Sequence, residues 1–348
     1  MAGKQRDDRP FRELKAAIRG RNPGRFYIFH GEETFLLRYY LDQLHDKCVD
    51  ALTEAFNYHR FHNENFSVQA FADAVENLPM MAERTLVQVD DIDLFKLGES
   101  DRTRLVEVFS DIPDYCTVVL TYETLEWKPD KRQKKLWEAV EGHASVVEFY
   151  RQDPRELIPW ITRHFAAQGK RISPELCNYL IGLTGGTMTA LSGEIRKIVA
   201  YSGAETICKA DIDAVTEPVL DAVVFQMTDL MGDGQFGRAL EKLRQLFRMQ
   251  QEPLAILGAV GTHFRRLSAA KILQNNGRGA EELMKLYSMW DSAARDTIRA
   301  SRRFSDAFLD KAVTLVMETD RMIKTSVDDP ERLLEILILT LAQEAKDG

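Results

Sequence analysis

The stretch FYIFHGEETFLLRYYL, residues 26–41, holds the pattern that decides the fold. It begins with a short aromatic and β-branched run, FYIFH, which is typical of a buried strand. Gly31 ends this run, and the apolar residues that follow recur at the spacing of one helix face: Phe35, Leu36, Tyr39, Tyr40 and Leu44. The stretch therefore predicts a strand, a tight turn and a helix.

Four further runs of the same kind follow along the chain. They are residues 57–61 (NYHRF), 85–89 (TLVQV), 116–122 (CTVVLTY) and 145–149 (SVVEF). Helical patterns separate them, including one with apolar residues at Val68, Phe71, Val75 and Leu78. Parallel neighbours need long crossovers of this kind, so residues 1–150 are predicted to form an α/β domain with a mainly parallel sheet.

The pattern changes after Tyr150. Asp153, Pro154 and Glu156 have the spacing of a helix cap with a capping box, and Ser173 with Pro174 begins a second helix in the same way. No convincing alternating strand follows, and Pro218 marks a link between helical parts because it disfavours helical geometry in the residue before it. We expect two all-α domains, a small one over residues 151–216 and a second over residues 217–348.

Composition places the chain among ordinary globular proteins. Its 348 residues are enough for two to three domains at about 150 residues each, and 45% of them are hydrophobic. Lysine and arginine number 46 against 54 aspartate and glutamate, a net charge of −8, so any nucleic-acid contact must come from a local patch. Four widely spaced cysteines suggest buried, reduced thiols. With no apolar export signal or membrane span, we expect a cytoplasmic protein without a membrane partner.

The turn after the first strand lacks a phosphate-binding motif. A P-loop needs GxxxxGK[ST], in which glycines expose backbone N–H groups and lysine neutralises the phosphates. Only Gly31 is present, and Glu32 and Glu33 are expected in the first helical turn, where they would repel phosphate. The sequence therefore predicts an ATPase-like domain whose nucleotide site is degenerate, with no cofactor and no catalytic residues of its own.

Three aspartates follow the TLVQV run at Asp90, Asp91 and Asp93. They resemble the acidic end of a magnesium-binding strand, but no phosphate loop accompanies them. An acidic, solvated turn is the simpler interpretation, and no metal site is predicted.

Several segments, taken in order, resemble the delta subunit family of the bacterial DNA polymerase III clamp loader. They are HGEETFLL at 30–37, NLPMMAERTLVQVDD at 77–91, PDKRQKKLW at 129–137, LSGEIRKIVAY at 191–201 and the run from VFQMTDL to THFRRL at 224–267. The resemblance implies a non-ATPase accessory subunit of a DNA-directed DNA polymerase that binds and opens the sliding clamp (the beta subunit). It also implies partner subunits (delta prime and gamma/tau), a C-terminal collar and primer-template DNA in the assembled complex.

The clamp contact implied by the resemblance falls at Leu78, Pro79, Met80 and Met81. The helical stripe is expected to end at Pro79, which leaves both methionines on a turn before the next strand. Family members often carry a leucine and phenylalanine pair here, so two methionines are a departure. Methionine is apolar and adaptable, which suits a plug for a partner's pocket. Periodicity alone favours the alternative, in which both methionines pack beneath the sheet.

Basic residues cluster in two places. After the fourth strand they are Lys128, Lys131, Arg132, Lys134 and Lys135, and in the last domain they include Arg265, Arg266, Arg295, Arg299, Arg302 and Arg303. A run of charges is usually a solvated surface, but the resemblance makes Lys131, Arg132, Lys134, Lys135, Arg265 and Arg266 candidates for phosphate contacts. Two other functions remain open from the sequence: an ATP-hydrolysing motor with a degenerate site, and a helical scaffold unrelated to replication.

Overall fold

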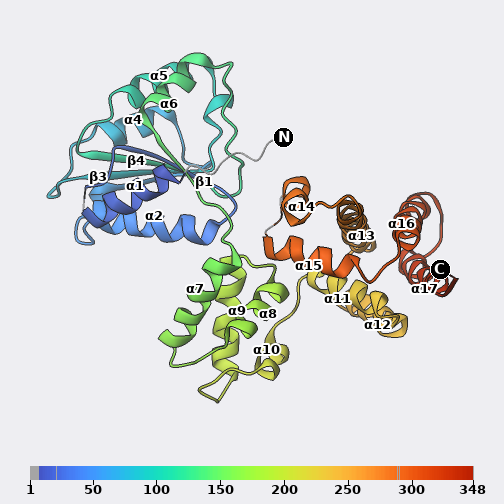
Figure 1. Cartoon of the computed structure of the whole chain (residues 1–348). Helices are drawn as coiled ribbons and strands as arrows, with labels where there is room; N and C mark the ends of the chain where they lie inside the picture. The colour runs from blue at the N-terminus through green and yellow to red at the C-terminus, as the bar shows by residue number, and fades with distance from the viewer. Residues whose placement is uncertain (1–7, 21, 288, 290, 348) are drawn as a thin grey trace. The chain divides into compact units, whose positions relative to one another are not determined.

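The computed structural model describes residues 8–20, 22–287, 289 and 291–347. The chain forms two compact units, one ending at Gln152 and the other beginning at Asp153 (Figure 1). The first is an α/β unit and the second is helical. The division of the helical part at residue 216 stays a prediction.

A five-stranded sheet forms the centre of the first unit. Its strands are β1 (Phe26–His30), β2 (Tyr58–Phe61), β3 (Thr85–Asp90), β4 (Cys116–Tyr122) and β5 (Ser145–Glu148). Their order is β2-β3-β4-β1-β5 and every neighbouring pair is parallel, which confirms the predicted fold class. The second strand starts one residue later than expected, because Asn57 ends the short helix α3 (Glu54–Asn57).

Helices cover both faces of this sheet (Figure 1). Alternating side chains of β1 point to opposite faces, as a strand requires. Tyr27 and Phe29 pack with α1 (Arg9–Gly20) and α2 (Thr34–Cys48), whereas Phe26 and Ile28 pack with the helices of the other face. Those helices are α4 (Val68–Glu76), α5 (Glu99–Ser110) and α6 (Lys134–His143), and the 3₁₀ turn η1 (Leu94–Lys96) joins the same core.

The second unit consists of helices, and its described residues form no strand beyond an isolated bridge between Arg171 and Thr206. The predicted caps are confirmed: Asp153 and Glu156 form a capping box on α7, and Ser173 accepts a hydrogen bond from the Leu176 N–H on α8. The helices are α7 (Pro154–Ala167), α8 (Pro174–Thr184), α9 (Met188–Tyr201), α10 (Lys209–Val215), α11 (Leu220–Gly232), α12 (Phe236–Arg248), α13 (Pro253–Asn275), α14 (Ala280–Tyr287), α15 (Asp291–Ser301), α16 (Asp306–Thr325) and α17 (Pro330–Asp347).

One core joins α11, α12, α13, α16 and α17. The apolar stripes of α12 and α17 meet there through Leu243, Leu246, Leu334, Leu337 and Leu341, all buried. None of the helices that the structure describes is long and apolar enough to span a bilayer.

The cysteines differ from the expectation at one position. Cys48, Cys116 and Cys177 are free and buried as expected, but Cys208 is exposed at the start of α10. Burial raises the pKa of the Cys48 and Cys116 thiols to about 11, so both stay protonated at neutral pH.

Candidate functional site

The turn between β1 and α2 is closed by the chain's own backbone. Gly31 has φ of +129°, and a Cβ there would lie 2.3 Å from the Phe149 carbonyl oxygen. The Phe149 N–H donates to the His30 carbonyl (2.7 Å), and the Glu33 N–H donates to the Phe149 carbonyl (3.0 Å). A helix N-terminus binds phosphate through free backbone N–H groups, and here the N–H of Glu33, just before the helix, already donates to a protein carbonyl.

The two glutamates of this turn lie outside the helix, which corrects the sequence expectation. Helix α2 begins at Thr34, and Glu33 is its N-cap residue with 1% of its surface exposed. Glu32 precedes the cap and is exposed. Of the two residues expected to repel phosphate from the first helical turn, Glu33 is therefore part of the buried junction between strand and helix.

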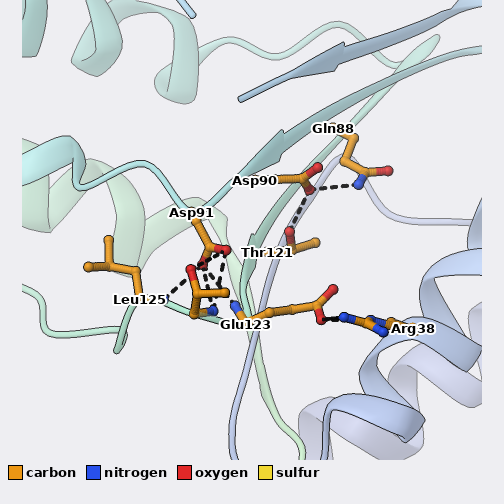
Figure 2. A network of polar contacts seen from close by, with 8 residues as sticks. Arg38, Gln88, Asp90, Asp91, Thr121, Glu123 and Leu125 are labelled. Atoms are coloured by element: carbon orange, nitrogen blue, oxygen red, sulfur yellow. Dashed lines mark hydrogen bonds and ion pairs between the residues drawn. The ribbon is translucent and has the colours of Figure 1, made fainter. Parts of the chain in front are cut away.

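The acidic residues at the end of β3 and in the turn after it are bonded within the protein (Figure 2). Asp90 accepts hydrogen bonds from Arg60 Nε, Gln88 Nε2 and Thr121 Oγ1, each at 2.6 Å. Asp93 caps η1 by accepting from the Phe95 N–H and forms an ion pair with Lys96. The acidic turn expected from the sequence is partly exposed, and its carboxylates are also bonded to other groups of the same unit.

Asp91, the residue after β3, bonds to the segment that follows β4. Its backbone has φ of +52°, and its carboxylate accepts from the backbone N–H groups of Glu123, Thr124 and Leu125 at 2.9 to 3.1 Å. Glu123 in turn pairs with Arg38 of α2 at 2.6 Å, and this bond raises the pKa of Arg38 (Figure 2). Across the described residues, no group of three or more His, Cys, Asp or Glu side chains is placed to hold a metal ion. These bonds connect the C-terminal ends of β3 and β4 to each other and to α2.

The segment from Leu78 to Met81 forms an exposed apolar loop, which we call the docking loop. The exposed fractions are 73% for Leu78, 54% for Met80 and 95% for Met81, while Pro79 is partly buried. Packing of the two methionines beneath the sheet is therefore wrong. The helical stripe also ends earlier than expected: α4 stops at Glu76, so Leu78 belongs to the loop.

Asn57 holds the docking loop in place, and the sequence analysis missed it. Its side chain is fully buried, with Nδ2 donating to the carbonyls of Met80 (2.9 Å) and Thr53 (3.1 Å). Its Oδ1 accepts from the Met80 N–H at 2.8 Å. Both backbone groups of Met80 are thus paired with one side chain, as they would be with a neighbouring strand. Met81 follows with φ of +53°, a conformation that bulky residues rarely adopt unless their surroundings impose it.

The first basic cluster lies on the loop before α6 and on its first turn. Lys131, Arg132, Lys134 and Lys135 are all exposed. Arg132 donates two hydrogen bonds to the Asp130 carboxylate, and they lower the pKa of Asp130. Lys131 Nζ lies 5.2 Å from the centre of the Trp137 ring. Lys134 and Lys135 add positive charge to a helix N-terminus whose first turn has no acidic residue. Lys134 Nζ lies 3.7 Å from Glu138 Oε1, so part of this charge is offset within α6.

The second basic pair differs in exposure. Arg265 is exposed and its Nη2 bonds Thr262, whereas Arg266 is partly buried with its guanidinium 5.8 Å from the Tyr287 ring centre. The remaining arginines of this region are held by side chains of the same unit: Arg295 by Asp291, Arg299 by Asp296, Arg302 by Gln274 and Arg303 by Asp229.

Two family models match the chain. The model described as DNA polymerase III, delta subunit, matches residues 27–150, and a model for the C-terminal domain of the DNA polymerase III delta protein matches residues 221–341. The chain belongs to the delta subunit family of DNA polymerase III. The docking loop and Asn57 lie within the first match, and Arg265 and Arg266 lie within the second.

Relatives in the delta subunit family match over most of their length. The DNA polymerase III subunit delta of Bacillus subtilis is 26% identical over 90% of this chain and 92% of its own. A probable DNA polymerase III subunit delta of Aquifex aeolicus is 24% identical over 75% of both chains. The solved DNA clamp loader delta protein (YqeN) of Bacillus subtilis shares the fold, with a TM-score of 0.60, 22% identity, and coverage of 96% of this chain and 99% of its own.

Proposed function

We propose that this chain is a non-ATPase subunit of the DNA polymerase III clamp loader that binds the ring-shaped sliding clamp and opens it for loading onto primed DNA. The observation that carries the proposal is the docking loop, in which Leu78, Met80 and Met81 expose apolar side chains on an ordered backbone. A soluble domain gains nothing from such exposure by itself, and patches of this kind usually serve recognition.

The loop has the chemistry of a plug. Methionine has an unbranched, polarizable side chain that adapts to an apolar pocket. Met81 is almost completely exposed, so a pocket that encloses it would remove nearly its whole side chain from water. The backbone is already fixed through Asn57, which reduces the conformational entropy that binding costs.

Lack of ATPase activity is supported by the strand-to-helix turn. The turn has no P-loop lysine, Gly31 is packed against Phe149, and the Glu33 N–H is already bonded. The work of this subunit is therefore binding, and ATP acts through its neighbours in the loader.

The helical unit serves assembly in this proposal. Residues 151–216 form a small lid-like domain, and residues 217–348 form the collar that joins the delta prime and gamma/tau subunits. Its surface carries apolar side chains suited to binding those neighbours: Ile272, Leu286, Met317, Ile336 and Leu339. Lys134 and Lys135, with Lys131, Arg132, Arg265 and Arg266, provide candidate phosphate contacts for primer-template DNA in the assembled, cytoplasmic complex.

The proposal is tested by mixing the full chain with a purified sliding clamp and measuring binding by calorimetry and size-exclusion chromatography. A saturable complex that forms without nucleotide supports the proposal. No complex at micromolar concentrations of both proteins would refute it, provided that the chain is folded by circular dichroism.

A further inference from the structure

Exposed apolar side chains in the first unit are concentrated on two short segments that Asn57 joins. Six large apolar side chains are exposed among the described residues of this unit, and five of them lie on two short segments. These are Leu52 and Phe56 around α3, and Leu78, Met80 and Met81 on the docking loop; the sixth is Tyr39 on α2. A random scatter of single exposed residues needs no explanation, but this concentration does.

The turn that carries Leu52 and Phe56 is held by hydrogen bonds although these side chains are exposed. The Leu52 N–H donates to Asp50 Oδ1 at 2.8 Å, and the Thr53 N–H donates to the Asp50 carbonyl at 2.9 Å. Leu52 is 93% exposed and Phe56 is 57% exposed. Hydrogen bonds thus fix the backbone of a turn whose two apolar side chains are exposed to water.

One buried amide joins the two segments. Asn57 Nδ2 donates to the Thr53 carbonyl of the turn and also to the Met80 carbonyl of the docking loop. The side-chain amide of Asn57 therefore bridges the backbones of Thr53 and Met80. Leu52 precedes Thr53 in the chain, and Phe56 precedes Asn57. The turn and the docking loop are therefore neighbours in space.

We propose that Leu52 and Phe56 form the second half of the docking surface, and that Asn57 is the positioning residue that holds both halves in one geometry. The proposed occupant is the sliding clamp, so this inference rests on the proposed function. The methionines enter the clamp's apolar pocket while Leu52 and Phe56 cover its rim. Without the Asn57 clasp the loop visits other conformations, and the apparent affinity falls in proportion to the competent fraction.

The experiment measures clamp affinity for three variants of the full chain by calorimetry. They are the double variant Leu52→Ser with Phe56→Ser, the double variant Met80→Ser with Met81→Ser, and Asn57→Ala. Tyr201→Ser is the matched control, because Tyr201 is 59% exposed but is the last residue of α9 in the other unit. We expect at least about tenfold weaker binding for the Leu52 and Phe56 variant, an unchanged melting temperature for it, and wild-type affinity for the control.

The Asn57→Ala variant has a readout that a purely structural role would not move. Hydrogen exchange of the Met80 amide should accelerate more than exchange in the core strands, and clamp binding should weaken about 3- to 30-fold. This loss should be smaller when Met80 and Met81 are already serine, because only the Leu52 and Phe56 half is then left for Asn57 to position.

The outcomes separate the two proposals. If the methionine variant binds weakly while the Leu52 and Phe56 variant binds like wild type, the two-part surface is wrong and the proposed function stands. If neither double variant weakens binding, the docking loop is not the clamp contact, and both proposals fail at this surface. Unchanged affinity of folded Asn57→Ala would overturn its positioning role.

Discussion

Replacing Met80 and Met81 with serine separates a docking role from a packing role. Enclosing a methionine side chain contributes about 1.5 to 3 kcal/mol relative to leaving it in water. Met81 is 95% exposed and Met80 is 54% exposed, so a pocket can gain nearly all of the first contribution and about half of the second. The double variant should therefore lose roughly 2 to 4 kcal/mol of clamp binding, which is about 30- to 700-fold in Kd.

The same structure predicts little effect on folding. Substitutions of exposed side chains usually change the free energy of unfolding by no more than about 0.5 kcal/mol. Clamp titrations by calorimetry and urea melts of the same preparation measure both quantities. A loss of several kcal/mol in stability, with clamp affinity intact in the folded fraction, would refute the docking reasoning and show that the methionines are core residues.

Three other predictions follow from the fold. The isolated chain should not bind ATP in calorimetry, because the β1–α2 turn lacks a lysine and its backbone is bonded to Phe149; stoichiometric binding at micromolar affinity would contradict this. A chain ending at Thr216 should still bind the clamp but fail to join purified partner subunits, and retained assembly would show that the domain roles are wrongly divided. Burial, with a smaller effect of Arg266, lowers the pKa of His263 to about 4. The unfolded chain, with a histidine pKa of about 6.5, binds that proton first, so stability should fall from pH 6.5 to 4 by up to about 1.4 kcal/mol per pH unit. Urea melts of His263→Gln should lack this part of the slope, and an identical pH profile would refute the assignment.

The sheet could be predicted from sequence because its strands are locally encoded. Each of the five is a short β-branched or aromatic run, and the parallel arrangement follows from the helices between them. The helix caps at Asp153 and Ser173 were predictable for the same reason, since a cap depends on residues only three positions apart.

The candidate site was predicted in part. The apolar residues of the docking loop could be identified in the sequence. Leu78 was assigned to the helix because its spacing from Val75 continues the apolar stripe of α4. Only tertiary structure shows the contact between Asn57 and Met80, which are 23 residues apart. An asparagine at the start of a strand-like run was the one available signal, and sequence alone does not reveal that its side chain is buried.

The hydrogen bonding of the acidic residues around the end of β3 could not be predicted, for a related reason. Asp91 accepts hydrogen bonds from backbone N–H groups of residues 123–125, more than 30 positions away, so its role depends on the pairing of β3 with β4. Glu33 was placed one residue too deep in the helix because the bond from its N–H to the Phe149 carbonyl fixes the junction.

Ring opening is the most direct test of the central claim, that this chain binds the clamp through the docking loop and opens it. A clamp carrying a donor and an acceptor dye across one of the ring's interfaces reports separation of that interface by a fall in energy transfer. The account predicts that the full chain, without nucleotide, lowers energy transfer, and that the Met80→Ser and Met81→Ser double variant does not at the same concentration. Unchanged energy transfer at saturating wild-type chain, or an equal fall with the double variant, would contradict it.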